Sequence, residues 1–393
     1  MAELTAEAKL AFLLQPASQG LLRTLCADSR DDLSLSSSPE LRSLAAPLRF
    51  ALLEQRKLRT KALRKCPQAG EMLFTALGLE QLTHWELSRY KASRLPQEIR
   101  SVADLCCGLG GDSLYLPNKI SVIGVDRSSA ALLAYRHNVG RRRQGWPVLA
   151  DVVASPVKAD MAFLDPSRRA LGKSNRWQDQ DLSPGWEAME KLIARYGNLA
   201  IKLGPGIALP TFLEEYEIEY LGLRDECLEA LVWTGQLGRP GRVRAVELPE
   251  GISLEADRLD LPDSFGAVAS PGNYLFEPVK AVVRSHLFGV LAASLGLWQI
   301  DSQIAYLSGT GPVDSPLLKA YRIIKELPFD FKVLREFLRK EEVGRLEVKK
   351  RGVNLIPEEF RAGLNLEGPN QGTLIFTKSM DKKTVFWTRA EKS

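Results

Sequence analysis

The sequence has few cysteines and no long apolar run, and each shortage excludes a class of protein. Its 393 residues include five cysteines, an odd number without metal-type spacing. That argues against a disulfide framework and fits a reducing compartment. No apolar run approaches the roughly 18 residues of a membrane span, and the first residues lack the basic and apolar segments of a secretory signal. We therefore expect a cytoplasmic protein without a metal site and without a membrane partner.

Charge and length set wider limits. A formal net charge of +5 over 393 residues permits an anionic partner but does not require one. The length indicates two or three domains. The sequence shows no internal repeat and no long low-complexity tract, so we expect an ordinary multidomain globular chain.

One glycine-rich stretch organises the rest of the chain. Residues 101–106 read as a buried strand that leads into Cys107-Gly108-Leu109-Gly110-Gly111-Asp112, and a second apolar run, 120–125, stops at Asp126. Glycines after a first strand let the backbone approach a ligand, and an acid at the tip of the next strand can bind the two hydroxyls of a ribose. This pairing predicts a nucleoside-containing cofactor at the carboxyl ends of parallel strands.

Strands and helices alternate through the middle of the chain, which predicts a doubly wound α/β region with a mostly parallel sheet. The predicted strands are 101–106, 120–125, 147–150, 160–165 and 198–203, and the predicted helices are 112–116, 127–139, 151–154 and 184–196. Two more strand-like runs, 218–223 and 230–233, follow. The polar segment between them is too short for a helical crossover, so we expect them to pair antiparallel.

The acid after the glycines discriminates between cofactors. A dinucleotide fingerprint would place a third glycine where Ser113 stands, and Asp112 in the first turn of the predicted helix would repel a pyrophosphate. A carboxylate there is favoured by the helix amino terminus and suits a ligand with positive charge. S-Adenosylmethionine carries an ammonium and a sulfonium, so we expect it rather than a nicotinamide.

The other strand-end residues then acquire roles. Asp104 can orient the amino acid portion of the cofactor, Asp126 its ribose, and Asp151 its adenine amine, although a purely structural role for Asp151 stays open. Close packing explains the small residues Cys106 and Cys107 better than reactivity does. The candidate cofactor-binding residues are Asp104, Cys106, Gly108, Gly110, Asp112, Asp126 and Asp151.

A candidate catalytic pair ends the fourth predicted strand. Pro166 fixes the turn, so the Asp165 carboxylate and a backbone carbonyl can aim at one point beside the methyl donor. Two acceptors at that point can hold an exocyclic amine and orient its lone pair, which is catalysis by positioning. Arg168 and Arg169 follow and have the fork geometry that suits phosphate. They are candidate substrate-binding residues, with pairing to the nearby surface acids Asp179 and Asp181 as the alternative.

These motifs resemble a known family. The segments 104–112, 124–126 and 165–166 look like the cofactor and catalytic motifs of class I S-adenosylmethionine-dependent methyltransferases, whose mostly parallel seven-stranded sheet closes in an antiparallel hairpin. The version with cysteine and paired glycines is similar to RNA guanine-N2 methyltransferases of the trimethylguanosine synthase type. The segments 272–278, 304–309, 348–353 and 373–377 look like bacterial methyltransferases with a ferredoxin-like segment and a THUMP-like carboxyl-terminal domain.

The resemblance implies a function. THUMP domains of other modification enzymes dock RNA, so it implies, by analogy, methyl transfer to a base nitrogen of tRNA or rRNA. One departure matters: base amine methyltransferases usually carry a second proline and an aromatic after the acid, to stack the flipped base, and here Ser167 and Arg168 stand there. Either an arginine plane or a distant aromatic such as Trp177 stacks the base, or the acceptor is not a base. A protein or small-molecule methyltransferase and a non-catalytic RNA-binding protein are the alternatives.

We therefore expect four regions: helices over 1–95, a Rossmann-like methyltransferase domain over 96–236, a linker and ferredoxin-like segment over 237–314, and a small α+β THUMP-like domain over 315–393. Residues 236–270, rich in glycine, proline and charge, read either as a linker or as strands of a small domain. Ser38-Pro39-Glu40 predicts the start of a helix that later carries a basic run, Arg56 to Lys65, facing either phosphates or solvent. Thr83 to Glu86 fits a capping box. Further helices are predicted over 278–295, 317–325 and 330–340, and strands over 372–377 and 385–387.

Overall fold

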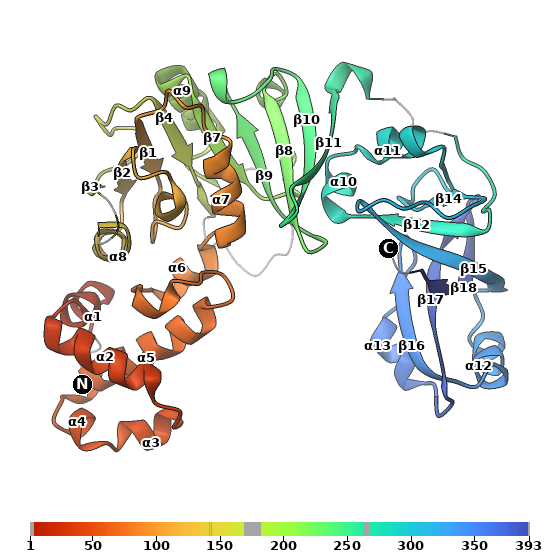
Figure 1. Ribbon diagram of the computed structural model, residues 1–393, viewed down its shortest axis with the longest axis horizontal. Coiled ribbons are helices and arrows are strands. Elements are labelled where there is room, and N and C mark those ends of the chain that lie inside the picture. The colour runs from red at the N-terminus through yellow and green to blue at the C-terminus, as the bar shows by residue number, and fades with distance from the viewer. Residues whose placement is uncertain (1–3, 141, 143, 169–181, 262–266, 392–393) are drawn as a thin grey trace. The chain divides into compact units, whose positions relative to one another are not determined.

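The computed structural model describes residues 4–140, 142, 144–168, 182–261 and 267–391 (Figure 1). The chain divides into two compact units. The first comprises Met1–Glu217 and Ala230–Pro240, and the second comprises Ile218–Glu229 and Gly241–Ser393. No helix among the described residues has both the length and the apolar character needed to cross a membrane.

The amino-terminal region is helical, as predicted. Its helices are α1 (Ala6–Leu13), α2 (Pro16–Ala27), α3 (Asp32–Ser36), α4 (Pro39–Arg42), α5 (Ala46–Ala62), α6 (Ala76–Gln81) and α7 (Trp85–Ser93), with the short η1 (Ala69–Glu71). The single helix predicted after Ser38 is instead divided into α4 and α5, since Pro47 in the first turn of α5 begins a new helix. Likewise His84, not Thr83, caps α7.

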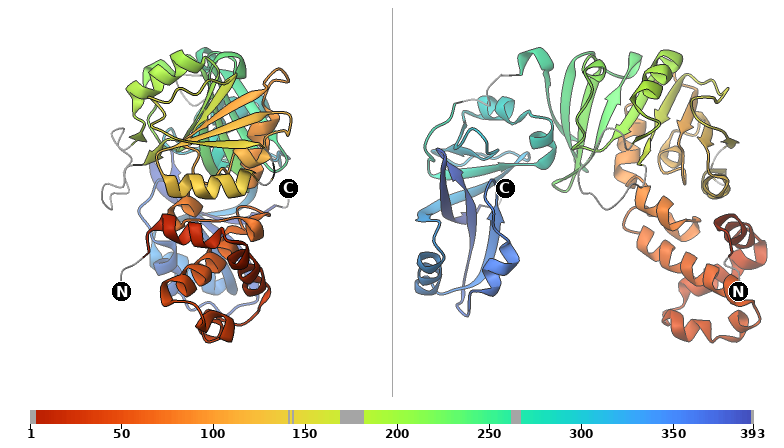
Figure 2. Two further views of the ribbon diagram at one scale, coloured as in Figure 1. Left: turned by 90° about the vertical axis from the view of Figure 1, so that its left-hand side faces the viewer. Right: turned by 180° about the vertical axis from the view of Figure 1, so that it is seen from behind.

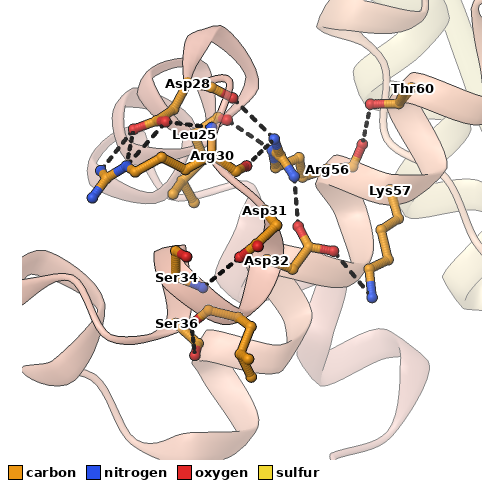
Figure 3. A network of polar contacts seen from close by, with 11 residues as sticks. Leu25, Asp28, Arg30, Asp31, Asp32, Ser34, Ser36, Arg56, Lys57 and Thr60 are labelled. Atoms are coloured by element: carbon orange, nitrogen blue, oxygen red, sulfur yellow. Dashed lines mark hydrogen bonds and ion pairs between the residues drawn. The ribbon is translucent and has the colours of Figure 1, made fainter.

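The basic run on α5 binds the protein itself. Arg56 donates hydrogen bonds to the carbonyl oxygens of Leu25 and Asp28, both at 2.9 Å, and to the Asp32 carboxylate (Figure 3). Buried Arg59 donates to the Met72 carbonyl oxygen at 2.8 Å. These two cations therefore join helices and loops of the amino-terminal region, which favours a structural role for them over a phosphate-binding one.

A nine-stranded sheet follows, in the order β11-β10-β8-β9-β7-β4-β1-β2-β3. Its strands are β1 (Ser101–Leu105), β2 (Ser121–Asp126), β3 (Gly145–Leu149), β4 (Met161–Leu164), β7 (Leu199–Leu203), β8 (Glu217–Leu223), β9 (Glu226–Trp233), β10 (Arg242–Leu248) and β11 (Ile252–Asp257). The strands β1, β2, β3, β4 and β7 are parallel, and β9 is antiparallel to β7. Figure 2 shows α8 (Ser129–Gly140) and α9 (Trp186–Tyr196) on opposite sides of this sheet.

The mostly parallel sheet and its hairpin are confirmed, and three details differ. The sheet has two strands beyond the expected seven, because residues 242–257, in the stretch that reads either as a linker or as strands of a small domain, form β10 and β11 of this sheet. The hairpin turn is only Arg224-Asp225, both with positive φ, so β9 begins earlier than predicted. The predicted helices 112–116 and 151–154 are wrong: the first is a three-residue turn, η2 (Ser113–Tyr115), and the second is a hydrogen-bonded turn. Other single-turn segments are η4 (Thr211–Leu213), η5 (Gly235–Leu237) and η6 (Arg258–Asp260).

The second unit holds a seven-stranded sheet in the order β13-β14-β12-β15-β18-β17-β16. Its elements are β12 (Tyr274–Pro278), α10 (Lys280–Arg284), α11 (Phe288–Leu295), β13 (Trp298–Gln299), β14 (Leu307–Gly309), β15 (Leu318–Pro328), α12 (Phe331–Lys340), β16 (Val343–Lys350), α13 (Pro357–Ala362), β17 (Asn370–Ser379) and β18 (Lys382–Ala390). Leu334, Leu338 and Phe360 bring α12 and α13 onto one face of the sheet.

Two helix predictions fail in this unit. The segment 317–325 lies mostly in β15, which pairs with β12 on one edge and β18 on the other. Leu318 and Tyr321 are buried three positions apart, and the register shifts between Ile323 and Lys325, so the apolar spacing imitates a helix. The segment 278–295 forms two helices, α10 and α11, because His286 has a positive φ and interrupts the helix between them.

Candidate active site

The glycine turn after β1 is built by backbone conformations that favour glycine. Cys106, Gly108 and Gly110 have φ values of 60°, 50° and 82°. A Cβ on Gly110 would lie 2.4 Å from Val139, whereas a Cβ on Gly108 would meet no atom within 4 Å among the described residues. Gly110 is therefore required for packing, while the backbone at Gly108 faces open space that a ligand can enter.

Asp126, at the end of β2, lies directly beside this turn. Its Oδ2 accepts a hydrogen bond from the Gly108 amide at 3.0 Å, and its Oδ1 accepts one from the Ser128 amide at 2.8 Å. The side chain is partly exposed. The two amides fix a carboxylate that still has lone pairs for the hydroxyls of a ribose.

Asp104 lies inside the protein, at 4 % exposure, and accepts a hydrogen bond from the Ser113 hydroxyl. The hydroxyl oxygen of Ser113 is also 3.2 Å from that of Tyr135. Burial raises the pKa of Asp104 to about 7, although the Ser113 hydrogen bond opposes the shift. Asp104 is therefore a buried residue that stabilises the glycine turn through its hydrogen bond with Ser113.

Asp112 has a cationic partner within the protein. Its carboxylate lies 2.7 Å from Nζ of Lys91, which is 1 % exposed, and accepts a hydrogen bond from the Ser88 hydroxyl at 2.8 Å. Burial acts to raise the pKa of Asp112, but Lys91 and Lys202 outweigh it and the net shift is downward. The expectation that a helix amino terminus stabilises this carboxylate is wrong, since η2 is a single turn. Lys91 offsets the Asp112 charge, which weakens the electrostatic argument for a cationic ligand.

Asp165 follows β4, and its amide donates to the Leu105 carbonyl oxygen at 3.2 Å, which ties it to the end of β1. Its Oδ2 lies 2.7 Å from Nζ of Lys202 on β7, and Nζ also donates to the Thr83 hydroxyl at 3.0 Å. Burial raises the pKa of Asp165, while the Lys202 ammonium opposes the rise. The Asp165 side chain is 34 % exposed, so a substrate can reach it, and Pro166 behind it is buried.

The structure brings the acids at the ends of three neighbouring strands together. Burial, and then the carboxylates of Asp126, Asp165 and Asp104, raise the pKa of the Cys106 thiol far above its usual range. All three carboxylates therefore act on one side chain of the glycine turn. These surroundings favour the neutral thiol, which agrees with a packing role for Cys106 rather than a nucleophilic one.

This geometry agrees with the relatives of the chain. It is 32 % identical over 341 residues to an uncharacterised S-adenosylmethionine-dependent methyltransferase of Mycobacterium tuberculosis, present in two strains, and the match covers 83 % of this chain and 92 % of the relative. The chain belongs to the S-adenosylmethionine-dependent methyltransferases.

Two further comparisons describe the architecture of this methyltransferase. A crystal structure of a candidate methyltransferase from Porphyromonas gingivalis W83 superposes over the whole of both chains with a TM-score of 0.79 at 21 % identity, so the two share a fold. Residues 318–390 match the family described as THUMP domain-like. The expected THUMP-like domain at the carboxyl-terminal end of the methyltransferase is therefore confirmed.

The residues present fit the cofactor of the family. Open space over Gly108, the fixed Asp126 carboxylate and the neighbouring strand ends match what the nucleoside part of S-adenosylmethionine requires. The assignment of individual contacts to Asp104, Cys106, Gly108, Gly110, Asp112, Asp126 and Asp151 stays a prediction.

The remaining predicted site residues are Asp151, Arg168 and Arg169, and no contact among the described residues indicates a ligand-binding role for them. Asp151 is 49 % exposed on its side chain; its carboxylate lies 3.7 Å from Arg127 and accepts a hydrogen bond from the Val153 amide, as in an ordinary turn. Arg168 belongs to β5 (Ser167–Arg168), which pairs antiparallel with β6 (Leu182–Ser183). Arg169, Trp177, Asp179 and Asp181 lie outside the described residues.

Sequence reasoning missed the polar residues that surround the two acids. Lys202 carries the clearest signal, since it is a lone cation within the apolar run of β7, where a buried charge requires a partner. Lys91 and Ser88 gave no such signal, because charged and polar residues are ordinary on a short amphipathic helix. Only the fold reveals that α7 lies against the turn after β1.

Proposed function

We propose that this methyltransferase transfers a methyl group to a base nitrogen of RNA. The observation that carries the proposal is the partly exposed Asp165 carboxylate, which lies at the end of β4 beside the glycine turn and precedes a buried proline. The THUMP-like match over 318–390 supports RNA as the substrate, by analogy with modification enzymes that dock RNA through such domains.

The site would act mainly by positioning. Bound S-adenosylmethionine supplies a methyl group on a positively charged sulfur. Asp165 and the carbonyl oxygen of Pro166 would accept hydrogen bonds from the two N–H groups of an exocyclic amine and direct its lone pair at that methyl carbon. As the nitrogen–carbon bond forms, the carbon–sulfur bond would break and the sulfur would leave as a neutral thioether. The nitrogen gains positive charge, which the nearby carboxylate stabilises until the proton passes to solvent.

One observation favours a second acceptor, an oxygen of the RNA ribose. The Lys202 ammonium lies 2.7 Å from Asp165 and reduces the negative field on an amine that is becoming cationic. The same ammonium would assist a hydroxyl that must lose its proton. The absence of an aromatic at Ser167 and Arg168, where a stacked base needs one, points the same way.

Methyl incorporation tests the proposal directly. Purified enzyme is incubated with deuterium-methyl S-adenosylmethionine and with RNA, protein and small-molecule fractions from a deletion strain, and the RNA is analysed by nucleoside mass spectrometry. A labelled base supports the first acceptor and a labelled ribose the second. Label in protein or metabolites alone would overturn the RNA assignment. Failure to bind S-adenosylmethionine in calorimetry would leave a non-catalytic RNA-binding protein.

A further inference from the structure

Lys202 is an unusual residue for its position in the fold. It lies in β7 between Ile201 and Leu203, both of which are buried, and β7 is an interior strand that is parallel to β4 and antiparallel to β9. Its own side chain is 19 % exposed. A lysine at such a position costs stability unless its ammonium is paired, and apolar residues pack better there. Its presence therefore calls for an explanation beyond packing.

The hydrogen bonds around Lys202 form a chain between two acids. Lys91 pairs with Asp112 at 2.7 Å, and Lys202 pairs with Asp165 at 2.7 Å. The Thr83 hydroxyl links the two pairs, since it accepts from Lys202 at 3.0 Å and donates to Asp112 at 3.4 Å. Each acid thus has its own cation, and the segment before α7 contributes the link.

We propose that Lys202 is a positioning residue of the methyl-transfer site, which holds the Asp165 carboxylate ionised and directs Oδ2 away from the acceptor. In the part of the chain that the structure describes, no hydrogen bond reaches Oδ1 of Asp165, so that oxygen is left for the substrate. This inference rests on the proposed role of Asp165 as the residue that binds the acceptor.

The charges that act on Asp165 predict what removal of Lys202 would do. Burial and the Asp112 carboxylate raise the pKa of Asp165, and Lys202 and Lys91 lower it. Asp104 is the other nearby acid, and the Cys106 thiol is neutral. Without the Lys202 ammonium the balance moves toward a protonated Asp165, and a neutral carboxyl group is a weaker hydrogen-bond acceptor for the substrate than a carboxylate.

The first test compares pH–rate profiles of the full-length enzyme. We expect Lys202→Met to move the acidic limb of the kcat profile up by about one pH unit, so that kcat on that limb falls by up to about tenfold, with KM for RNA nearly unchanged. Lys202→Arg keeps the charge and should keep the limb. Lys191→Met removes an exposed lysine of α9, paired only with Glu187 in the described structure, and is the control. If Lys202→Met lowers kcat but leaves the acidic limb of the kcat profile at the wild-type pH, Lys202 has only a structural role.

A second measurement needs no substrate. Carbon-13 NMR of carboxyl-labelled aspartate, with Asp165→Asn to assign the signal, gives the pKa of Asp165 in the wild type and in each variant. We expect a higher pKa in Lys202→Met, and a smaller rise in Thr83→Val, which keeps the ammonium but removes one of its partners. An Asp165 pKa that is equal in all three proteins overturns the inference. A shifted pKa in an enzyme that methylates no RNA would instead contradict the proposed function.

Discussion

Each unit of the chain contains a partly buried group of paired charges, and the two groups differ in what surrounds them. In the first unit, Asp112 and Asp165 each face one lysine beside the glycine turn. In the second, Glu277 on β12 lies 2.6 Å from Nζ of Lys349 and 3.5 Å from Arg351. The second group also has aromatic neighbours, since the Arg351 guanidinium lies 5.0 Å from the ring centre of Tyr306.

The two groups differ in how completely their side chains are bonded within the protein. Glu277, Tyr306 and Arg351 come from three segments whose motifs resemble the carboxyl-terminal part of the family, and their contacts join those segments. Arg351 also donates to the Ala305 carbonyl oxygen at 2.8 Å, so the group is bound on several sides. Asp165, by contrast, lies at a strand end, is a third exposed, and keeps one carboxylate oxygen for a ligand. The proposed catalytic role of Asp165 therefore rests on its position at a strand end and its exposed carboxylate oxygen, since both groups are partly buried.

Asp165→Asn should give the largest effect and breaks the comparison most directly. The amide offers only one acceptor oxygen and cannot pair with Lys202, so we expect kcat to fall by about 10³-fold, or about 4 kcal/mol of transition-state stabilisation. Affinity for S-adenosylmethionine should change little. Methyl-transfer assays quenched at fixed times measure kcat, and calorimetry measures the affinity for S-adenosylmethionine. An active variant would remove Asp165 from the catalytic site.

Asp104→Asn should change how stability depends on pH. The pKa of folded Asp104, about 7, is above the ordinary value of 3.8. The folded protein therefore holds this proton to higher pH than the unfolded chain, and the free energy of unfolding falls as pH rises from about 4 to 7. Asparagine does not titrate, so the variant should lack this loss, and its free energy of unfolding relative to the wild type should rise by about 4 kcal/mol from pH 4 to pH 8. Urea unfolding at both pH values measures it; parallel curves would show that Asp104 is not perturbed.

The strands and the acids near their ends could be predicted from the sequence, because each depends on a local apolar run. The apolar runs 101–106, 120–125 and 160–165 predict strands, and their parallel arrangement places Asp104, Asp126 and Asp165 near one edge of the sheet. Helix 317–325 failed because Leu318 and Tyr321 fit a helical spacing, and only pairing with β12 and β18 reveals a strand.

The partners of the acids could not be predicted for a related reason. The Lys91–Asp112 and Lys202–Asp165 pairs join residues from separate elements, and periodicity carries no information on which elements meet. The sequence predicts a helix after the glycine turn, whose dipole would stabilise the Asp112 carboxylate. The structure has only a single turn there, and Lys91 supplies the positive charge instead. That ligands bind at the carboxyl ends of parallel strands is a general rule. The positions of Lys91 and Lys202 beside the acids depend instead on how the elements of this chain pack together.

Glu277→Gln tests the structural side of the comparison. Loss of the carboxylate removes the short ion pair of Lys349 and the ion pair of Arg351, and we expect the free energy of unfolding to fall by about 2 kcal/mol. The rate of methyl transfer to a free nucleoside acceptor should not change. Glu347→Gln is the control, because that side chain is 56 % exposed and lies 4.0 Å from the same lysine. A Glu277 variant with normal stability but lower kcat would place this group in the function after all.

The smallest effect separates two proposed cofactor contacts. Asp126 is fixed by the Gly108 and Ser128 amides, so its lone pairs are oriented before a ribose binds. Asp126→Asn should weaken binding of S-adenosylmethionine about tenfold, since asparagine keeps one acceptor and loses the charge. Asp151→Asn should weaken it about threefold if the carboxylate reaches the adenine amine, and not at all if Asp151 only stabilises its turn. Asp160→Asn, at a carboxylate bonded to the Arg100 and Ser101 amides, controls for general loss of structure. Equal losses in Asp126→Asn and Asp160→Asn would mean that the effect is on folding, and Asp126 would then belong with Glu277 among the structural acids.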